Sequence, residues 1–293
     1  MNKIFKENKY QIVHSHINSL SVFPLFSAYL AKVPIRIAHS HSTTHKSDRK
    51  SNFLKNVLRR FSKLFATNYF ACSEHAGEWL FGKKALKEGK IAVIKNAIDV
   101  DKFKYDVIMR DKMRKKLGVE DKIVFGHVGR FAKQKNHDFL IDIFFDIYQK
   151  RKDIVLLLIG EGPLEEKIKE KVKEKGLDDV VKFLGTKENV NDYMQAMDIF
   201  LFPSLYEGLG IVLVEAQCSG MMCLASTEVP KEVELTQNIF FAENRIDIWE
   251  SLILEHLNYK RESDIRNISV NGYSIKDSVV DLENRYLELV NNL

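Results

Sequence analysis

A glycine turn between an apolar strand and an apolar helix is the stretch of this sequence best suited to bind a ligand. Residues Phe202–Gly220, FPSLYEGLGIVLVEAQCSG, place the turn at Gly208 and Gly210. The first N–H groups of a helix lack partners inside the helix and lie at the positive end of its dipole, so they attract anions such as phosphate. Two carboxylates flank the turn, Glu207 and Glu215. Carboxylates accept hydrogen bonds from sugar hydroxyls, so their place beside a phosphate site predicts a nucleotide sugar.

Positive side chains follow an earlier apolar run. Arg130 and Lys135 lie in VGRFAKQKNH, directly after Ile123–Val128. Positive charge there suits a diphosphate leaving group, which gains negative charge in the transition state. The alternative is a solvated basic loop. The downstream glycine turn and its two glutamates would bind the same ligand as these cations, and this agreement favours a functional site. No Asp-x-Asp motif stands at a predicted strand end, so we expect no metal ligands, with Lys, Arg and the helix N-terminus in place of a divalent metal.

Four histidines follow two other predicted strands. His14 and His16 come after the first strand, and His39 and His41 come after the second. A single histidine in such a place usually caps or packs locally. Because four of them occur at strand ends, where ligands of parallel α/β folds bind, contact with a ligand and local capping or packing are equally favoured.

Strands and helices must alternate along the chain to position these groups. The alternation occurs in two sets separated by a predicted linker at Asp99–Asp106, which indicates parallel sheets covered by helices on both faces. We therefore predict an α/β fold with two Rossmann-like, doubly wound domains and a cleft between them: residues 1–105, residues 106–275, and a C-terminal helix at 276–293 that packs back toward the first domain. The predicted strands are Tyr10–Val13, Pro34–Ala38, Tyr69–Cys72, Ile91–Ile94, Ile123–Val128, Val155–Ile159, Val180–Phe183, Asp198–Phe202, Met221–Ala225 and Ile239–Phe241.

Composition indicates a cytoplasmic protein that binds an anionic partner. The chain has 293 residues, 45% hydrophobic, and three cysteines without pairing or metal-ligand spacing. Neither a signal region nor a stretch of about 18 apolar residues is present. Residues 1–100 hold 17 Lys and Arg against 6 Asp and Glu, a balance of +11, whereas the remainder has a balance of −6. A membrane surface or phosphorylated lipid is favoured over nucleic acid, for which no motif occurs.

The stretch Lys50–Phe65 has the pattern of a basic amphipathic helix. One interpretation places its apolar face on the first sheet, with its lysines and arginines solvated. The other places it on the cytoplasmic leaflet, where basic residues are attracted to anionic lipids. We expect peripheral association with the inner face of the membrane under either interpretation, because lysines outside the helix also contribute.

Taken together, these motifs resemble glycosyltransferase family 4, whose members are retaining enzymes of the GT-B fold. GR-F-x-x-x-K, FLG at Phe183–Gly185 and P-S-x-x-E-G-x-G-x-x-x-x-E at Pro203–Glu215 look like its nucleotide-sugar domain. IVHSH, VPIRIAHSH, ACSE and VIKNAID resemble segments of its acceptor domain. The subgroup that makes bacterial capsular polysaccharide or exopolysaccharide is the most similar by eye.

The resemblance implies roles for individual residues. Glu207 would bind a hydroxyl of the donor sugar, Glu215 the ribose hydroxyls, and residues after Gly185 the base. His39 or His41, with His41 preferred, would face the reacting carbon. The donor is expected to be a UDP-sugar, without a further cofactor. Its diphosphate would be held by Gly129, Arg130, Lys135, Gly208, Leu209 and Gly210.

The resemblance also implies a reaction and its alternatives. A sugar would move from the nucleoside diphosphate to a hydroxyl of a lipid-linked saccharide in polysaccharide biosynthesis, with retention. The family usually opens with a strand and a glycine-rich loop, for which there is no counterpart before Tyr10, so we expect an incomplete first domain. A donor-binding subunit that needs a partner chain for that segment is therefore one alternative. A sugar-nucleotide epimerase of the same architecture is another.

Overall fold

A computed structural model describes residues 1–41, 57–58, 60–61 and 63–293. The chain divides into two compact units. Unit 1 comprises Met1–Ala97 and Ile275–Leu293, and unit 2 comprises Ile98–Ser274. Among the described residues, no helix combines the length and the apolar character that crossing a membrane requires.

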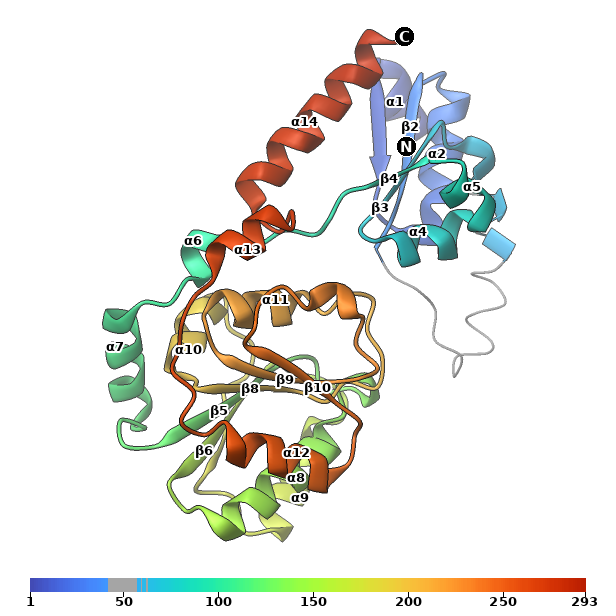
Figure 1. Ribbon diagram of the computed structural model, residues 1–293. Coiled ribbons are helices and arrows are strands. Elements are labelled where there is room, and N and C mark those ends of the chain that lie inside the picture. The colour runs from blue at the N-terminus through green and yellow to red at the C-terminus, as the bar shows by residue number, and fades with distance from the viewer. Residues whose placement is uncertain (42–56, 59, 62) are drawn as a thin grey trace. The chain divides into compact units, whose positions relative to one another are not determined.

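Unit 1 is built on a parallel sheet whose described strands lie in chain order, β1-β2-β3-β4 (Figure 1). Helices cover both of its faces, as the sequence predicts for a parallel sheet. The strands are β1 (Ile12–Ser15), β2 (Ile35–Ser40), β3 (Asn68–Ala71) and β4 (Ile91–Val93). The helices are α1 (Asn2–Asn8), η1 (Asn18–Ser21), α2 (Val22–Leu30), α4 (Glu74–Phe81), α5 (Lys83–Lys87) and α14 (Ile275–Asn291).

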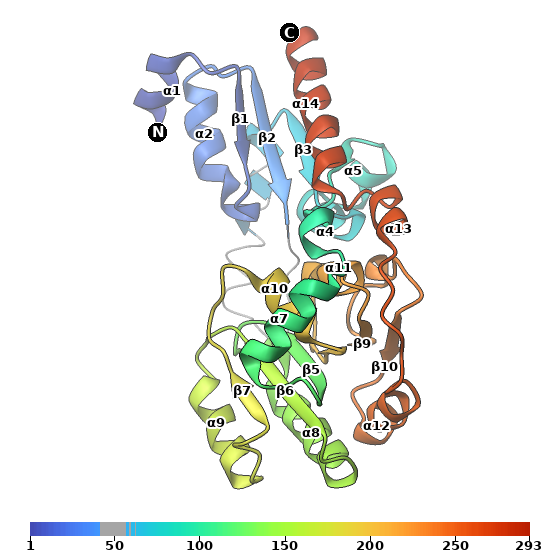
Figure 2. The ribbon, with the colours of Figure 1, turned by 90° about the vertical axis from the view of Figure 1, so that its left-hand side faces the viewer.

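The last helix of the chain covers one face of this sheet. Leu282, Tyr286 and Leu289 recur at helical spacing on α14 and pack against a cluster that includes Ile35 and Ile37 of β2. Figure 2 shows α14 on one side of the sheet and α2 on the other. Successive residues of a strand point to opposite faces of the sheet. His39 and His41, two and four positions after Ile37, therefore lie on the face that α14 covers.

Unit 2 has the strand order of a doubly wound fold. Within residues 98–274 the parallel sheet runs β10-β9-β8-β5-β6-β7, so the chain starts at the centre, moves to one edge and then returns to the other side of β5. The strands are β5 (Ile123–Val128), β6 (Ile154–Ile159), β7 (Val181–Phe183), β8 (Ile199–Phe202), β9 (Met222–Ser226) and β10 (Ile239–Ala242). The helices are α6 (Val100–Phe103), α7 (Val107–Leu117), η2 (Lys133–Lys135), α8 (His137–Lys150), α9 (Glu165–Glu174), α10 (Val190–Ala196), α11 (Ile211–Cys218), η3 (Lys231–Val233), α12 (Ile246–Glu255) and α13 (Ile265–Val270).

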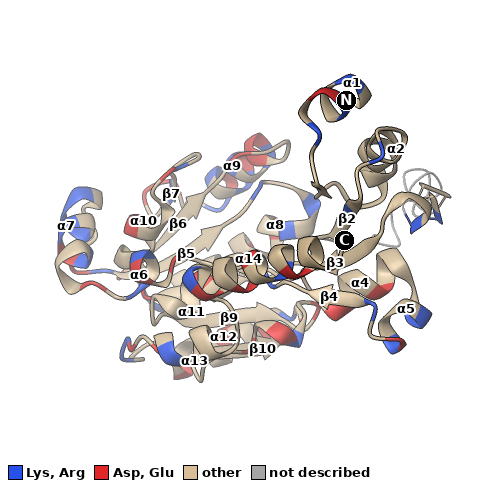
Figure 3. Cartoon of the chain, turned by 90° about the horizontal axis from the view of Figure 1, so that it is seen from above, with Lys and Arg blue, Asp and Glu red and all other residues tan. Residues whose placement is uncertain are grey.

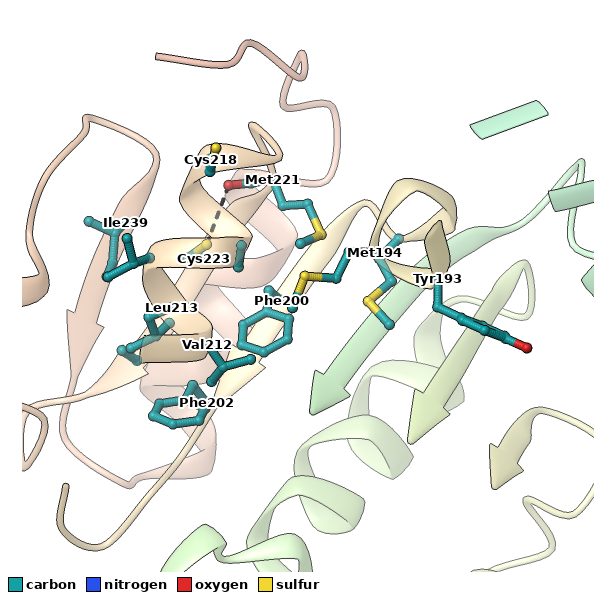
Figure 4. Close-up of a cluster of buried hydrophobic side chains, with 14 of the residues drawn as sticks. Tyr193, Met194, Phe200, Phe202, Val212, Leu213, Cys218, Met221, Cys223 and Ile239 are labelled. Carbon is teal, nitrogen blue, oxygen red and sulfur yellow. Dashed lines mark hydrogen bonds between the residues drawn. The ribbon is translucent and has the colours of Figure 1, made fainter. Parts of the chain in front are cut away.

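Apolar side chains fill both sides of the unit 2 sheet. On one side, Phe200 and Phe202 of β8 pack with Val212 and Leu213 of α11, as Figure 4 shows. On the other side, α8, α9 and α12 pack on the sheet, with Trp249 of α12 fully buried (Figure 1). Every residue of β6 and β8 is buried, which explains why these strands are continuous apolar runs.

Asp198 holds the start of β8 against β5. Its carboxylate accepts hydrogen bonds from Arg110 at 2.5 Å, from Arg114 at 3.0 Å and from the backbone N–H of Val124 at 2.8 Å. Its own backbone N–H donates to the carbonyl of Val124 at 2.7 Å. The two central strands are thus held in register at their amino ends, away from the loops that follow them.

The structure confirms the α/β class with two parallel sheets and differs from the sequence predictions in detail. The predicted linker at Asp99–Asp106 contains α6 and belongs to unit 2; the carboxylate of Asp99 accepts a hydrogen bond from the N–H of Lys102, which starts that helix. Helix α1 precedes β1, where no element was predicted. The predicted helix Lys50–Phe65 lies mostly outside the described residues.

A substitution at Gly160, directly after β6, would test how closely the loops of unit 2 pack. It has φ +134°, and a Cβ there would lie 2.2 Å from the carbonyl oxygen of Gly129. Gly176 has φ +64° with open space around it. We predict that Gly176→Ala lowers the free energy of unfolding by about 1 kcal/mol, through backbone strain alone. Gly160→Ala should cost about 3 kcal/mol, since the Gly129 loop must also move. Equal losses in thermal unfolding experiments would contradict this packing.

Candidate functional site

Two loops of unit 2 meet where its strand order reverses. Gly129 and Arg130 follow β5, and the segment that contains Glu207 follows the neighbouring strand β8. A crevice forms at the carboxyl ends of strands at such a switch point, and ligands of open α/β sheets bind there. The structure therefore brings together these predicted residues from positions more than 70 apart in the sequence.

Lys135 and Glu207 form an ion pair between these loops. Nζ of Lys135 lies 2.7 Å from Oε1 of Glu207, and the side chains are 17% and 7% exposed. The ammonium group also lies 4.5 Å from the centre of the Phe202 ring. Each charge is largely removed from water, so each depends on its partner, and removing one of them would leave the other uncompensated. Arg130, in contrast, is exposed.

Polar groups beside the ion pair fix the two loops to each other. The N–H of Leu205 donates to the carbonyl of Gln134 at 2.8 Å, and Nε2 of Gln134 donates to the carbonyl of Tyr206 at 3.0 Å. Nδ2 of Asn136 donates to the carbonyl of Pro203 at 3.2 Å. Sequence analysis missed Gln134 and Asn136. Asn136 directly precedes α8 with φ +56°, a conformation that asparagine tolerates better than most residues, so its residue type is the one local signal in the sequence.

The glycine turn leads into α11 as predicted. Gly210 precedes the helix with φ +85°, a conformation that favours glycine, and a Cβ there would lie 3.3 Å from Phe202. Leu209 is buried and anchors the turn to the core, while Gly208 adds no side chain. The first N–H groups of α11 therefore follow a turn in which Gly208 and Gly210 carry no side chains.

Glu215 lies within α11 in surroundings that disfavour its charge. Burial raises the pKa of its carboxyl from 4.5 to about 7. A carboxyl with such a pKa changes between a donor and an acceptor of hydrogen bonds near neutral pH. Hydrogen bonds from ligand hydroxyls would favour its ionised form.

A third loop contributes further polar groups at the same edge of the sheet. Oε1 of Glu161, after β6, accepts hydrogen bonds from Oγ1 of Thr186 at 3.2 Å and from its N–H at 3.4 Å. Thr186 follows β7 and Gly185, where the resemblance places contacts to the base. Glu161 was not predicted, because a glutamate after an apolar strand has no distinctive spacing.

In unit 1, the four predicted histidines form one block. Nε2 of His14 lies 3.0 Å from Nδ1 of His39, and Nδ1 of His16 lies 2.8 Å from Nε2 of His41. The two pairs lie one over the other, with ring centres 4.0 Å apart between His14 and His16 and between His39 and His41. Burial lowers the pKa of His14 to about 3 and that of His39 to about 2, with the neighbouring imidazoles adding to the effect. All four side chains are therefore neutral imidazoles at neutral pH.

Three of these histidines are close enough to consider a metal ion. His14, His16 and His39 each place a ring nitrogen within 4.8 Å of the others. Zn–N bonds measure about 2.0–2.1 Å and zinc sites are tetrahedral, so two nitrogens on one ion lie about 3.3 Å apart. Nε2 of His14 and Nδ1 of His39 lie 3.0 Å apart, the length of an ordinary hydrogen bond. We therefore describe the block as a hydrogen-bonded group, and the expectation of no metal ligands stays a prediction.

The pKa of Glu215 generates a test that needs no ligand. A carboxyl whose pKa is raised in the folded state stabilises the protein fully below its unfolded pKa, and this contribution is lost as the pH rises through about 7. We predict that Glu215→Gln matches the wild type at pH 4.5 and is more stable at pH 8, by roughly 1–3 kcal/mol. Glu188→Gln, at an exposed position, is the control. A stability difference that does not change with pH would refute the assignment.

Comparisons with known proteins agree over both units. The family model described as Glycosyl transferases group 1 matches residues 109–260, and the one described as Glycosyltransferase Family 4 matches residues 1–102. A Bacillus subtilis protein named as the glycosyltransferase EpsF is 33% identical over 97% of this chain and 77% of its own length. An Escherichia coli UDP-Gal:alpha-D-GlcNAc-diphosphoundecaprenol alpha-1,3-galactosyltransferase is 26% identical over 99% of this chain and 78% of its own length.

Solved structures show the same fold. Anabaena HepE in complex with UDP has a TM-score of 0.79 at 21% identity, over 100% of this chain and 81% of that chain. Sucrose-phosphate synthase from Thermosynechococcus elongatus has a TM-score of 0.81 at 18% identity, over 99% and 76% of the two chains. With the strand order of unit 2 and the family match over residues 109–260, these similarities lead to one assignment: the chain belongs to the glycosyl transferases group 1, as a family 4 glycosyltransferase with the GT-B fold.

Proposed function

We propose that this glycosyltransferase moves a hexose-type sugar from a UDP-sugar to a hydroxyl of a lipid-linked saccharide during polysaccharide biosynthesis, with retention of anomeric configuration. The observation that carries the proposal is the Lys135–Glu207 ion pair at the switch point of unit 2. The name of the Escherichia coli relative supports a UDP-sugar donor and a diphosphoundecaprenol-linked acceptor, and a Staphylococcus aureus relative is named for capsular polysaccharide biosynthesis.

The ion pair supplies both kinds of group that a sugar diphosphate requires. A diphosphate at the N-terminus of α11 would attract the ammonium group of Lys135, aided by the exposed side chain of Arg130. Glu207 would then exchange its bond to Lys135 for a hydrogen bond from a hydroxyl of the donor sugar. These cations would stabilise the charge that develops on the departing diphosphate. Donor binding therefore costs one ion pair and gains charge-assisted bonds to the ligand.

The remaining predicted roles follow the same geometry. Glu215, further along α11, would accept hydrogen bonds from the ribose hydroxyls, and Thr186 lies where the base is expected. His41 or His39 of unit 1 would face the reacting carbon. Retention would follow if the donor phosphate itself deprotonates the acceptor hydroxyl on the face that it leaves.

Donor binding can be tested with a variant that leaves no unpaired charge. Replacing both members of the pair, Lys135→Met with Glu207→Gln, removes two charges and keeps the side-chain volumes similar. We predict that UDP binding, followed by calorimetry, weakens about thirtyfold, which corresponds to roughly 2 kcal/mol for a lost charge-assisted hydrogen bond. Lys133→Ala, in the same turn of η2 and exposed, is the matched control. UDP affinity equal to that of the wild type in the double variant would reject the site.

Turnover assays with the wild-type chain separate the candidate reactions. The proposal requires product from a UDP-sugar only when a lipid-linked saccharide is present, and NMR of the new glycosidic bond should show the donor's anomeric configuration. Conversion of the donor without acceptor would indicate an epimerase instead. UDP binding without turnover under any of these conditions would indicate a donor-binding subunit.

Membrane association is a second part of the proposal, motivated by the charge of the first hundred residues. Lys83, Lys84 and Lys87 of α5 are exposed, and Figure 3 shows Lys and Arg on α5 and α1. Lys63, part of the stretch assigned to a basic helix, instead donates to the carbonyl of Phe81 at 3.0 Å, so it also has a structural role. The lysines of α5 are therefore the cleaner test of attraction to an anionic bilayer.

We predict that the chain sediments with anionic vesicles but not with neutral ones, and that salt weakens this binding because exposed charges are screened over about 8 Å at physiological ionic strength. Replacing Lys83, Lys84 and Lys87 by Gln should lower binding at low salt by roughly 1 kcal/mol per charge. Replacing Lys112, Lys115 and Lys116 of α7 removes the same charge from unit 2 and should have little effect. Similar losses in both triple variants would show attraction by overall charge instead of docking by unit 1.

A further inference from the structure

Three side chains of unit 1 form a continuous series of hydrogen bonds from α14 to β2. The hydroxyl of Tyr286 lies 2.5 Å from Nδ1 of His14, and Nε2 of His14 lies 3.0 Å from Nδ1 of His39. We call this series the Tyr286–His14–His39 relay. Tyr286 and His14 are 272 positions apart, so the relay exists only when α14 packs on the sheet.

The direction of these hydrogen bonds follows from what each group can donate. A neutral phenol has one O–H, and beside the lone pair of an imidazole nitrogen it acts as the donor. Burial raises the pKa of Tyr286, which keeps its hydroxyl protonated. When Nδ1 of His14 accepts from Tyr286, the proton of His14 lies on Nε2 and is donated to Nδ1 of His39. The proton of His39 must then lie on its Nε2.

The far end of the relay has no acceptor among the residues that the structure describes. His39 is 3% exposed, and within the described residues its Nε2 has no hydrogen-bond partner. An unsatisfied polar atom at this depth is unfavourable and rare in folded proteins. His39 is the last residue of β2 on the face that α14 covers, near the carboxyl ends of the strands, where a ligand of a parallel sheet is expected. A ligand oxygen would supply the acceptor that this N–H lacks.

The surroundings fix the orientation of the His39 ring independently of the relay. Its ring centre lies 4.0 Å from that of His41, and Phe70 meets it edge-on at 6.1 Å. His41 is held in turn by the bond between its backbone N–H and Oδ1 of Asn18, at 2.7 Å. Loss of the phenol O–H would therefore leave the ring in place and change only which nitrogen carries the proton.

We propose that Tyr286 is a positioning residue that, through His14, fixes His39 as the tautomer whose Nε2–H donates to an oxygen of the bound substrate. The acceptor is a phosphoryl or sugar hydroxyl oxygen, and this part rests on the proposed function. Because His39 is a neutral imidazole, the side chain binds by hydrogen-bond direction and not by charge. In the opposite tautomer, Nε2 would present a lone pair, which repels a phosphoryl oxygen and can only accept a hydrogen bond from a sugar hydroxyl.

The tautomer of His39 can be measured without any substrate. Two-dimensional ¹H–¹⁵N NMR of the full chain labelled with ¹⁵N-histidine distinguishes protonated from unprotonated ring nitrogens, and His39→Gln assigns the signal. We expect wild-type His39 to be protonated at Nε2. Tyr286→Phe, which removes one oxygen atom, should convert it to a mixture of both tautomers. A wild-type His39 protonated at Nδ1, or an unchanged tautomer in Tyr286→Phe, would overturn the relay.

Activity then tests what the tautomer does. In Tyr286→Phe we expect kcat with a UDP-sugar and acceptor to fall about two- to tenfold, the range expected for one neutral hydrogen bond. Tyr10→Phe, whose ring is exposed in the same unit, is the control and should change neither kcat nor the tautomer. Unchanged kcat despite a shifted tautomer would refute the substrate contact. The NMR result stands apart from turnover, so failure of the proposed reaction and failure of the relay are distinguishable.

Discussion

The pairing of β8 with β5 is the constraint on which the donor side of this protein depends. These strands are far apart in the sequence, and the loops that follow them can share a ligand only if the strands are neighbours. Asp198 secures the pairing through two arginines and the backbone of Val124, all at the amino ends of the strands. A partly buried carboxylate with several donors is sensitive to the loss of any of them. Placing it at the opposite end of the sheet leaves the carboxyl ends free for polar loops.

Much of unit 2 could be predicted from local sequence. The apolar runs of β6 and β8 are continuous because both faces of a parallel sheet are covered. Gly210 indicated the turn into α11 because few other residues adopt its φ. The ion pair between Lys135 and Glu207 could not be predicted as a pair. Its members were each assigned to a ligand, and only the structure shows that their side chains meet.

The histidines show the same limit in unit 1. Their spacing of two along each strand placed them on one face, yet the sequence gives no register between strands. The register Ile12↔Ile35 in the parallel pair β1 and β2 is what stacks the four rings into two hydrogen-bonded pairs. Tyr286 was indistinguishable from the other apolar contacts of an amphipathic helix, because helical spacing predicts which face is buried but not which hydroxyl finds a partner.

The discontinuity of unit 1 also has a consequence for biosynthesis. Its sheet is made from the beginning of the chain, whereas α14, which covers one face of that sheet, follows all of unit 2. Domains generally fold as units while the chain is synthesised, and contacts over long sequence separations form late. Unit 2 can thus fold while Ile35 and Ile37 are still exposed on the face that α14 later covers. A ribosome that stalls before α14 would release a chain whose first sheet exposes apolar surface, which marks it for chaperones and proteases.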